Sequence, residues 1–278
     1  MPLLSKVLFN QLVNRIPKSL DYKFNNSLIG PKNFYEKVIC NVLVRKLGKS
    51  GEKYSDKNKT KTYEFWEGEG GLSWFTETNN DEYKISFKEQ SDYMIKEINL
   101  LISSQKIKNL CLIDISTGNG NYLDFLTKEI NNAEIRAIGF DINGKIINKN
   151  LERDDLKHIE FKQGLLTEHE DYILNLSKNN TICFFSRKSL TLYNNNEFNG
   201  LLNFLNKIRS SAYFFIIEVN NFNYKKEIET EYRDSPIFYG HNYPLIFKKN
   251  NWKMIWSKKK YINIFINDHW IYYGFSKK

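Results

Sequence analysis

The sequence contains little cysteine and little proline. Its 278 residues include three cysteines and five prolines. Cys40, Cys111 and Cys183 are odd in number and far apart, so we expect neither a disulfide framework nor a cysteine-ligated metal site. Cys111 and Cys183 each lie in an apolar, strand-like run, which is typical of buried free thiols. These features predict a cytoplasmic protein that holds no metal.

Long apolar runs are also missing. No uninterrupted stretch approaches the ~20 residues that a membrane-spanning helix needs. The N-terminus, MPLLSKVLFNQLVNRI, is amphipathic, and its polar residues break any signal-like hydrophobic run. With 41% apolar and 26% charged residues, the composition is that of a globular protein and not of a disordered chain.

The net charge of +9 is unevenly distributed. Residues 1–60 hold 12 Lys/Arg and 4 Asp/Glu, whereas residues 61–278 hold 29 and 28. Apolar residues at helical spacing predict two amphipathic helices in this basic N-terminal extension, within 3–16 and 34–47. The extension either packs its apolar faces on the remainder or contacts an anionic membrane surface or an acidic protein, which would make the protein peripheral to a membrane. A nucleic-acid partner is disfavoured because the nearly neutral remainder continues no basic track.

Strand-like and helix-like segments alternate from residue 86 onward. The expected strands are 110–115, 135–140, 158–162, 181–185 and 212–219. The expected helices are 86–104, 120–131, 143–151, 167–177 and 196–209. Two longer strands, 252–266 and 269–276, follow and read as a hairpin. The pattern predicts an α/β fold with a Rossmann-like, mostly parallel seven-stranded sheet and an antiparallel C-terminal hairpin.

The sharpest motif is the run from Asp114 to Gly120, Asp-Ile-Ser-Thr-Gly-Asn-Gly, between a strand and a helix. Small residues in such a turn let the backbone approach a ligand, and the following helix offers unpaired N–H groups. Asp141 ends the next strand, where a carboxylate can accept both ribose hydroxyls of a nucleotide. Alternatively, the turn binds nothing and Asp141 is a helix N-cap.

Residues 86–278 resemble the class I S-adenosylmethionine-dependent methyltransferases. The resemblance implies that the methionine end of the cofactor is held by the first strand and its loop, at Asp114, Ser116, Gly118 and Gly120. It assigns the ribose to Asp141. Ser116 stands where the family usually has its first glycine. The exit of the third strand lacks the family's acid for the adenine amino group, so Gln163, or backbone near Gly164, has to substitute.

The fourth strand and its exit, with Ser186 and Arg187, look like the family's region where substrate and methyl donor meet. The segment has no Asp/Asn-Pro-Pro motif and no Pro-Cys pair, which disfavours methylation of nucleic-acid bases. A looser likeness to bacterial enzymes of sugars and surface glycans points to a small-molecule or glycan acceptor, with a hydroxyl or an amine.

Methyl transfer to a hydroxyl needs a base. His241 follows the fifth strand in a Gly/Asn/Tyr segment, which we interpret as a loop with an accessible imidazole that titrates near neutrality. Alternatively, His241 is a surface histidine or one that stabilises the loop. Glu218 ends the fifth strand and is either a second base, a ligand of a sugar hydroxyl, or a strand-end cap. Arg187 either neutralises a phosphate or carboxylate on the substrate or lies solvated at the surface.

An aromatic and glycine-rich segment, Tyr63 to Phe75 with Trp66, precedes the first long helix. We predict that residues 61–85 form a lid over the cofactor or a strap packed on the sheet.

Two other functions stay open. A dinucleotide-dependent oxidoreductase would normally need a third glycine, and Leu123 occupies that place. A non-catalytic protein with this fold, serving as a scaffold or partner, is favoured by Ser116 and by the missing acid at the third strand.

Overall fold

The computed structural model describes residues 64, 66–69, 71–72, 80–220, 229–233, 238–263 and 268–277. The basic extension 1–60 lies outside these residues, as do residues 61–63, 65, 70 and 73–79 of the predicted lid or strap. The domain boundaries predicted there therefore stay predictions. The described residues of Thr62–Glu231 and Tyr239–Lys278 belong to one compact unit. No helix in the described ranges is long and apolar enough to cross a membrane.

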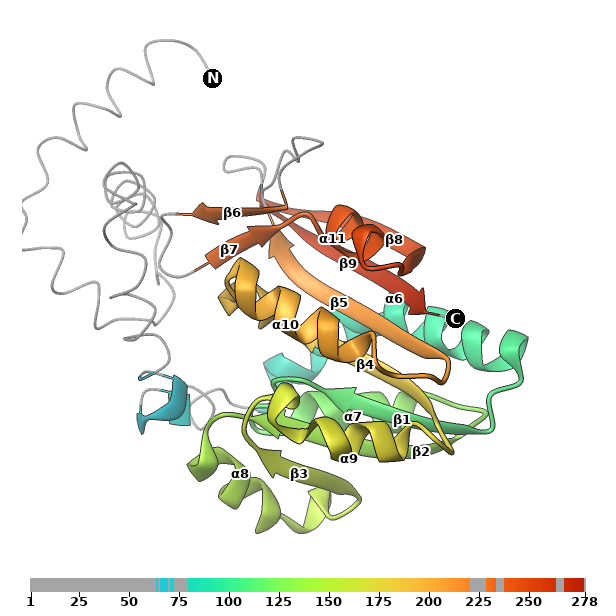
Figure 1. The fold of residues 1–278 in the computed structure, drawn as a ribbon. Coiled ribbons are helices and arrows are strands. Elements are labelled where there is room, and N and C mark those ends of the chain that lie inside the picture. Colours follow the sequence, from blue (N-terminus) through green and yellow to red (C-terminus); the bar gives the residue numbers. More distant parts are fainter. Residues whose placement is uncertain are drawn as a thin grey trace, which may run out of the picture. The chain divides into compact units, whose positions relative to one another are not determined.

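A seven-stranded sheet forms the centre of this unit, in the order β3-β2-β1-β4-β5-β9-β8 (Figure 1). The first five strands are parallel, and β9 runs antiparallel between β5 and β8. This arrangement confirms the fold predicted from the sequence. The strands are β1 (Asn109–Asp114), β2 (Glu134–Asp141), β3 (Ile159–Gln163), β4 (Thr181–Arg187), β5 (Ala212–Asn220), β8 (Lys253–Asn263) and β9 (Asp268–Lys277).

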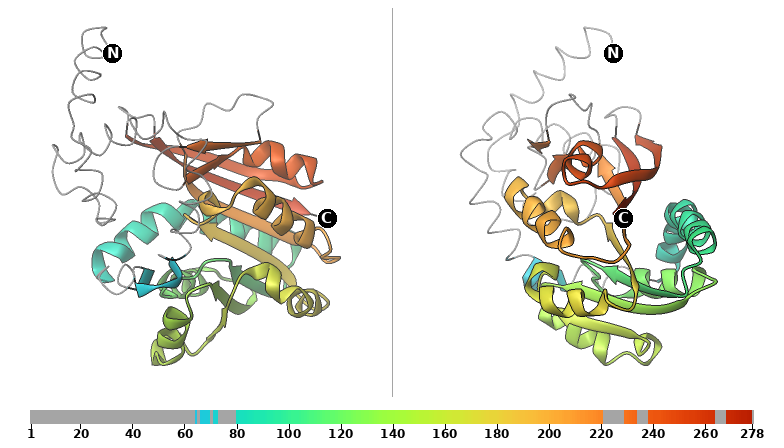
Figure 2. Two further views of the ribbon diagram at one scale, coloured as in Figure 1. Left: turned by 60° about the vertical axis from the view of Figure 1, so that its left-hand side comes forward. Right: turned by 45° about the vertical axis from the view of Figure 1, so that its right-hand side comes forward.

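Helices cover both faces of the sheet, and Figure 2 shows α6 on the side opposite to α9 and α10. One apolar cluster joins the sheet to α6 (Asn80–Gln105), α7 (Asn121–Glu129) and α8 (Gly144–Leu151). A second cluster joins it to α9 (Glu170–Leu176), α10 (Asn195–Leu205) and α11 (Tyr243–Lys249). We name the two sides the α6–α8 face and the α9–α11 face.

Alternation along each strand sends neighbouring side chains to opposite faces. In β1, Leu110 and Leu112 pack on the α6–α8 face, whereas Cys111 and Ile113 pack on the α9–α11 face. The residue that ends a strand follows the same alternation. Whether a candidate site residue lies at an odd or an even position along its strand (its parity) therefore decides which face of the sheet its side chain is on.

The segment around His241 differs from the prediction. His241 does not lie in a loop: it ends β7 (Phe238–His241), which pairs with β6 (Thr230–Arg233) in a two-stranded sheet. Asn242 then caps α11, because its side chain accepts a hydrogen bond from the Leu245 N–H at 3.3 Å. Proline in the first turn of α11 favours a helix start as well.

Candidate functional site

The loop between β1 and α7 passes over the end of β2. The Thr117 N–H donates to the Phe140 carbonyl at 2.7 Å, and the Gly118 N–H donates to Oδ2 of Asp141 at 2.8 Å. The Asn150 side chain of α8 donates to the Gly118 carbonyl at 2.7 Å. Gly118 has φ 53°, in the left-handed region that favours glycine. The N–H and the carbonyl of Gly118 are therefore both hydrogen-bonded to other elements, β2 and α8.

Gly120 precedes α7 with φ 74°. A side chain added there would meet the Phe161 ring at 2.8 Å and Leu156 at 3.0 Å. The glycine is therefore required by its conformation and by packing against β3 and the turn before it. This packing explains Gly120 without a ligand, so its predicted contact with the methionine end has no separate support.

Asp114 is buried at the end of β1, with 3% of its surface exposed. The Ser116 N–H donates to its Oδ1 at 3.1 Å, and the Ser116 hydroxyl donates to the Ile115 carbonyl. Burial raises the pKa of Asp114 to about 7; the Ser116 N–H and the charge of Arg187 oppose the rise, and the charge of Asp141 adds to it. A cation bound here would favour the ionised carboxylate.

Asp141 ends β2 beside this loop. Its Oδ1 accepts from the Asn143 N–H at 2.9 Å, while Oδ2 holds Gly118. Burial raises the pKa of Asp141 against the effect of these two N–H donors. The N-cap of α8 is Asn143 and not Asp141, since the Asn143 side chain accepts from the Ile146 N–H. The carboxylate of Asp141 is therefore available for a ligand.

Sequence reasoning missed Asn143, which is fully buried. Its Nδ2 donates to the Trp66 carbonyl at 2.7 Å and to the Gly68 carbonyl at 3.1 Å. Lys145 forms an ion pair with Glu69 on the same segment. The described part of the aromatic segment is thus held at the β2–α8 turn, next to Asp141. The signal was present as the pair Asn143-Gly144, which begins two residues after the end of β2.

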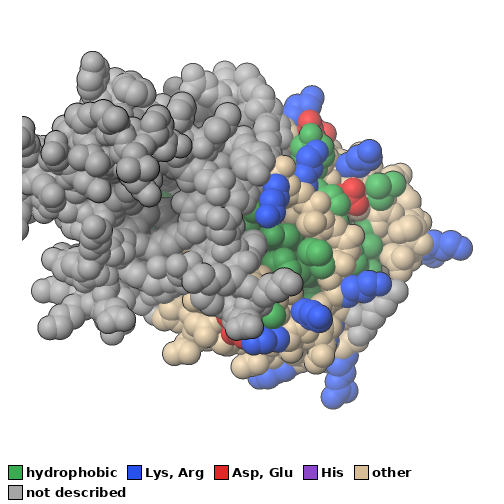
Figure 3. Space-filling model, turned by 90° about the horizontal axis from the view of Figure 1, so that it is seen from above, with side chains coloured by type: hydrophobic (Ala, Val, Ile, Leu, Met, Phe, Trp, Pro, Cys, Tyr) green, Lys and Arg blue, Asp and Glu red, His purple; other side chains and the backbone are tan. Residues whose placement is uncertain are grey.

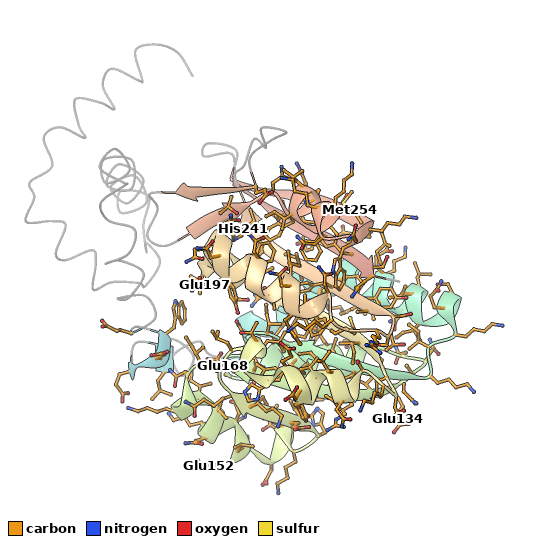
Figure 4. The ribbon with its side chains drawn as sticks, viewed as in Figure 1. Glu134, Glu152, Glu168, Glu197, His241 and Met254 are labelled. Carbon is orange, nitrogen blue, oxygen red and sulfur yellow. The ribbon has the colours of Figure 1, made fainter. Side chains whose placement is uncertain are left out.

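The exit of β3 lies on the other side of Asp141. The Gly164 N–H donates to the Asp141 carbonyl at 2.8 Å, and Gly164 has φ 112°. Gln163 packs its amide against Gly144, where an added side chain would meet it at 2.7 Å. Glu168, also missed by sequence reasoning, bonds through Oε2 to the Leu165 N–H at 2.9 Å. Figure 4 labels Glu168, which follows β3 in the chain, whereas the last residue of β3, Gln163, is not an acid.

The candidate residues of β4 and β5 leave the sheet on different faces. Phe185 packs on the α6–α8 face and Phe184 on the opposite one, so parity places Arg187 on the α6–α8 face with Asp114. The Arg187 guanidinium carbon lies 4.9 Å from the centre of the Tyr122 ring of α7. These three residues gather beside the β1–α7 loop.

Ser186 and Glu218 belong to the α9–α11 face instead. Oε1 of Glu218 accepts from the Ser186 hydroxyl at 3.1 Å and from the Ser189 and Leu190 N–H groups at 3.0 and 2.9 Å. Only 1% of Glu218 is exposed, and burial raises its pKa to about 7 against the effect of these donors. The structure thus brings Glu218 to the turn after β4 and not to Asp114.

The expectation of an accessible, near-neutral His241 is wrong. The side chain is completely buried, and the centre of its ring lies 4.8 Å from the centre of the Phe198 ring on α10. Figure 4 labels His241 near α10. Nε2 lies 2.9 Å from the Leu190 carbonyl and Nδ1 lies 3.0 Å from the Thr230 hydroxyl. Burial lowers the pKa of His241 to about 4, because the charged imidazolium loses its hydration.

No family model and no curated protein matches the chain. Among solved structures it is similar to magnesium protoporphyrin IX methyltransferase from Synechocystis PCC 6803, at 11% identity over 79% of this chain and 100% of that one, with a TM-score of 0.47. N-methyltransferase NodS from Bradyrhizobium japonicum WM9 matches at 11% identity over 69% and 97%, with a TM-score of 0.45. The 1,6-didemethyltoxoflavin-N1-methyltransferase from Burkholderia thailandensis matches at 8% identity over 72% and 92%, with a TM-score of 0.42. Similarity this distant identifies no residue and no substrate in this chain.

Proposed function

We propose that the chain is an S-adenosylmethionine-dependent methyltransferase that holds its cofactor at the carboxyl ends of β1 and β2. One observation carries the proposal. Asp114 and Asp141 end neighbouring parallel strands, are largely buried, and flank the backbone of residues 116–118, which donates to both carboxylates. Two such carboxylates match the two kinds of donor on the cofactor, an ammonium group and a pair of ribose hydroxyls.

The chemistry of the donor set fits this cofactor. The raised pKa of Asp114 means that a cation can stabilise its ionised form, as the ammonium of the methionine moiety would. Each oxygen of Asp141 accepts one described N–H and keeps a further lone pair for a hydroxyl. Gln163 and Glu168 supply acceptors near the β3 exit for an adenine amino group, and Trp66 lies on the segment held by Asn143.

When bound, the cofactor supplies an electrophilic methyl group on a positively charged sulfur. The residues of this chain contribute binding and orientation, which turn an encounter of two molecules into a reaction within one site. Ser116 and Gly118 shape the turn beside Asp114. Arg187, on the same face, offers a cation for a carboxylate or phosphate group.

The acceptor class is inferred from one side chain. Arg187 ends β4, next to the strand that carries Asp114, and lies on the same face of the sheet as Asp114. A small molecule or sugar with a hydroxyl or an amine, and with an acidic group for Arg187, fits this side chain. Screening nucleotide sugars and glycan fragments for methyl transfer tests this acceptor class directly.

The cofactor assignment is tested by replacing Asp141 with alanine. The variant is expected to bind S-adenosylmethionine about 10- to 150-fold more weakly, because hydrogen bonds to a charged group contribute roughly 1.5–3 kcal/mol. Titration calorimetry measures the effect, and Asp171→Ala on α9 serves as the matched control. Unchanged affinity in Asp141→Ala would reject the ribose assignment.

Two other functions are separated by the same titration. Binding of NADH in place of S-adenosylmethionine would favour an oxidoreductase, although the fully buried Leu123 fills the position where that fold needs a glycine. Binding of neither nucleotide would favour a non-catalytic protein with this fold.

We also propose that residues 1–60 attach the protein to an anionic surface. Their surplus of eight basic residues is the supporting observation. On one face of the described part, Lys and Arg side chains are dispersed among polar and apolar ones (Figure 3). The full chain is expected to sediment with anionic vesicles at low salt and to be released at high salt, since each cation near such a surface contributes about 1 kcal/mol.

The matched controls are neutral vesicles and a chain that lacks residues 1–60, and both are expected to leave the protein in the supernatant. If the full chain also stays there at low salt, the extension has no affinity for an anionic membrane. Binding to an acidic protein partner would then be the other outcome to measure.

A further inference from the structure

The backbone of Leu190, at the start of a short 3₁₀ turn (Leu190–Leu192), is hydrogen-bonded at both its N–H and its carbonyl by buried side chains. Its N–H donates to Oε1 of Glu218 at 2.9 Å, and its carbonyl accepts from Nε2 of His241 at 2.9 Å. Glu218 is 1% exposed and His241 is 0% exposed. The two residues come from β5 and β7, so a peptide after β4 connects three separate strands.

The hydrogen bonds decide which nitrogen of His241 carries the proton. A carbonyl oxygen only accepts, so Nε2 carries the hydrogen toward Leu190. Nδ1 then carries no hydrogen and can only accept; the Thr230 hydroxyl lies 3.0 Å from it and 3.2 Å from Oδ1 of Asn195. Both nitrogens of the neutral ring are engaged, so neither is directed at a substrate proton.

Glu218 is likewise occupied. Its Oε1 accepts from Ser186, Ser189 and Leu190, while Oε2 is buried and has no hydrogen-bond partner in the described part of the chain. Ser186 lies near the end of β4, and the other two donors lie in the turn that follows it. The carboxylate therefore holds the shape of this turn.

The turn held in this way is strained. Lys188 has φ 61°, which a non-glycine residue adopts only when its surroundings fix it. The Lys188 N–H donates to the Ile217 carbonyl at 3.0 Å, and the next two N–H groups bind Glu218. Arg187 and Lys188, the two cations of the turn, are thus placed immediately before the peptides that Glu218 and His241 bind.

We propose that Glu218 and His241 are positioning residues rather than bases: they bind the N–H and the carbonyl of Leu190 and so hold Arg187 beside the cofactor site. This inference rests on the proposed function for its catalytic meaning. The hydrogen bonds of Glu218 and His241 to Leu190 are present in the protein without cofactor, so they can be tested separately from the proposed function.

Hydrogen exchange at the Ser189 and Leu190 amides measures how firmly these hydrogen bonds hold the turn. The measurement does not require the methyl acceptor to be known. Glu218→Ala is expected to speed their exchange at least ~10-fold, because the common acceptor is lost and the turn opens locally. His241→Ala is expected to speed exchange at Leu190. Glu218→Gln and His241→Gln, which retain a carbonyl acceptor and an amide donor, are expected to stay within about threefold of the parent.

Glu197→Gln, which alters a capping carboxylate on α10, is the matched control and is expected to leave these amides unchanged. Exchange in β1 and the thermal midpoint report whether each variant is folded. Unchanged exchange in folded Glu218→Ala and His241→Ala would overturn the inference. A parent protein that binds no S-adenosylmethionine would reject the proposed function and leave the exchange results standing.

Turnover distinguishes the two roles once an acceptor is found. Positioning predicts that each glutamine variant keeps turnover within ~10-fold of the parent, while each alanine variant loses ~100-fold or more. The pH profile of the glutamine variants is expected to match that of the parent. Glutamine variants that are as inactive as the alanine ones, with normal exchange at Leu190, would identify a base instead.

Discussion

Replacing Gly118 with valine is expected to weaken binding of S-adenosylmethionine by at least ~100-fold. Gly118 has φ 53°, and a β-branched residue there is strained. Its N–H and carbonyl are bound by Asp141 and Asn150, so the backbone cannot relax without losing both contacts. On the proposed function, the added side chain would also crowd the methionine moiety that this loop holds.

Titration calorimetry measures this loss, and a thermal melt shows whether the variant folds. Gly118→Asn is the matched control, because asparagine tolerates the left-handed region and removes most of the backbone strain. Weak binding by both variants would indicate crowding of the ligand. Weak binding by Gly118→Val alone would indicate backbone strain. Tight binding by folded Gly118→Val would show that the loop does not hold the cofactor.

Affinity for S-adenosylmethionine is expected to rise on the order of 50-fold between pH 5 and pH 7. Asp114 has a pKa of about 7 without ligand, mainly because it is buried. The ammonium of the cofactor binds the ionised carboxylate, so at pH 5 most of the protein must first lose a proton. Affinity then changes by about tenfold per pH unit below the pKa of the free site.

The stability of the cofactor-free protein changes in the opposite sense through this group. An unfolded aspartate has a pKa near ~3.9, so the contribution of Asp114 to folding is complete below that pH and is lost as the pH rises toward 7. Asp114→Asn is expected to bind S-adenosylmethionine weakly. Its affinity is also expected to lack the part of the pH dependence that comes from Asp114. Equal affinity of the parent protein at pH 5 and pH 7 would contradict the ammonium assignment.

The strands could be predicted from the sequence because their apolar runs are continuous. The run from Thr181 was expected to end at residue 185 and ends at Arg187, and the other sheet strands agree similarly well. The helix α11 was missed. It has seven residues, too few for a clear periodic pattern, and its evidence was the Asn242 cap followed by proline.

The site was predictable in part. Asp114 and Asp141 are recognisable because a carboxylate that ends an apolar strand is conspicuous. The separation of Arg187 from Glu218 was also encoded, since strand alternation assigns them to opposite faces. The burial of His241 was not, because it depends on β6 and β7 and on contact with Phe198, which no local pattern indicates.

Among the described residues, two buried cysteines lie on neighbouring strands but on opposite faces of the sheet: Cys111 packs in the α9–α11 cluster and Cys183 in the α6–α8 cluster. Burial raises the pKa of both thiols, so neither reacts while its layer is closed. The alkylation rate of each thiol therefore reports how fast the helices on its own face of the sheet move away and expose it. Equal rates would mean that the two layers unfold as one cooperative unit, and unequal rates would identify the layer that opens first.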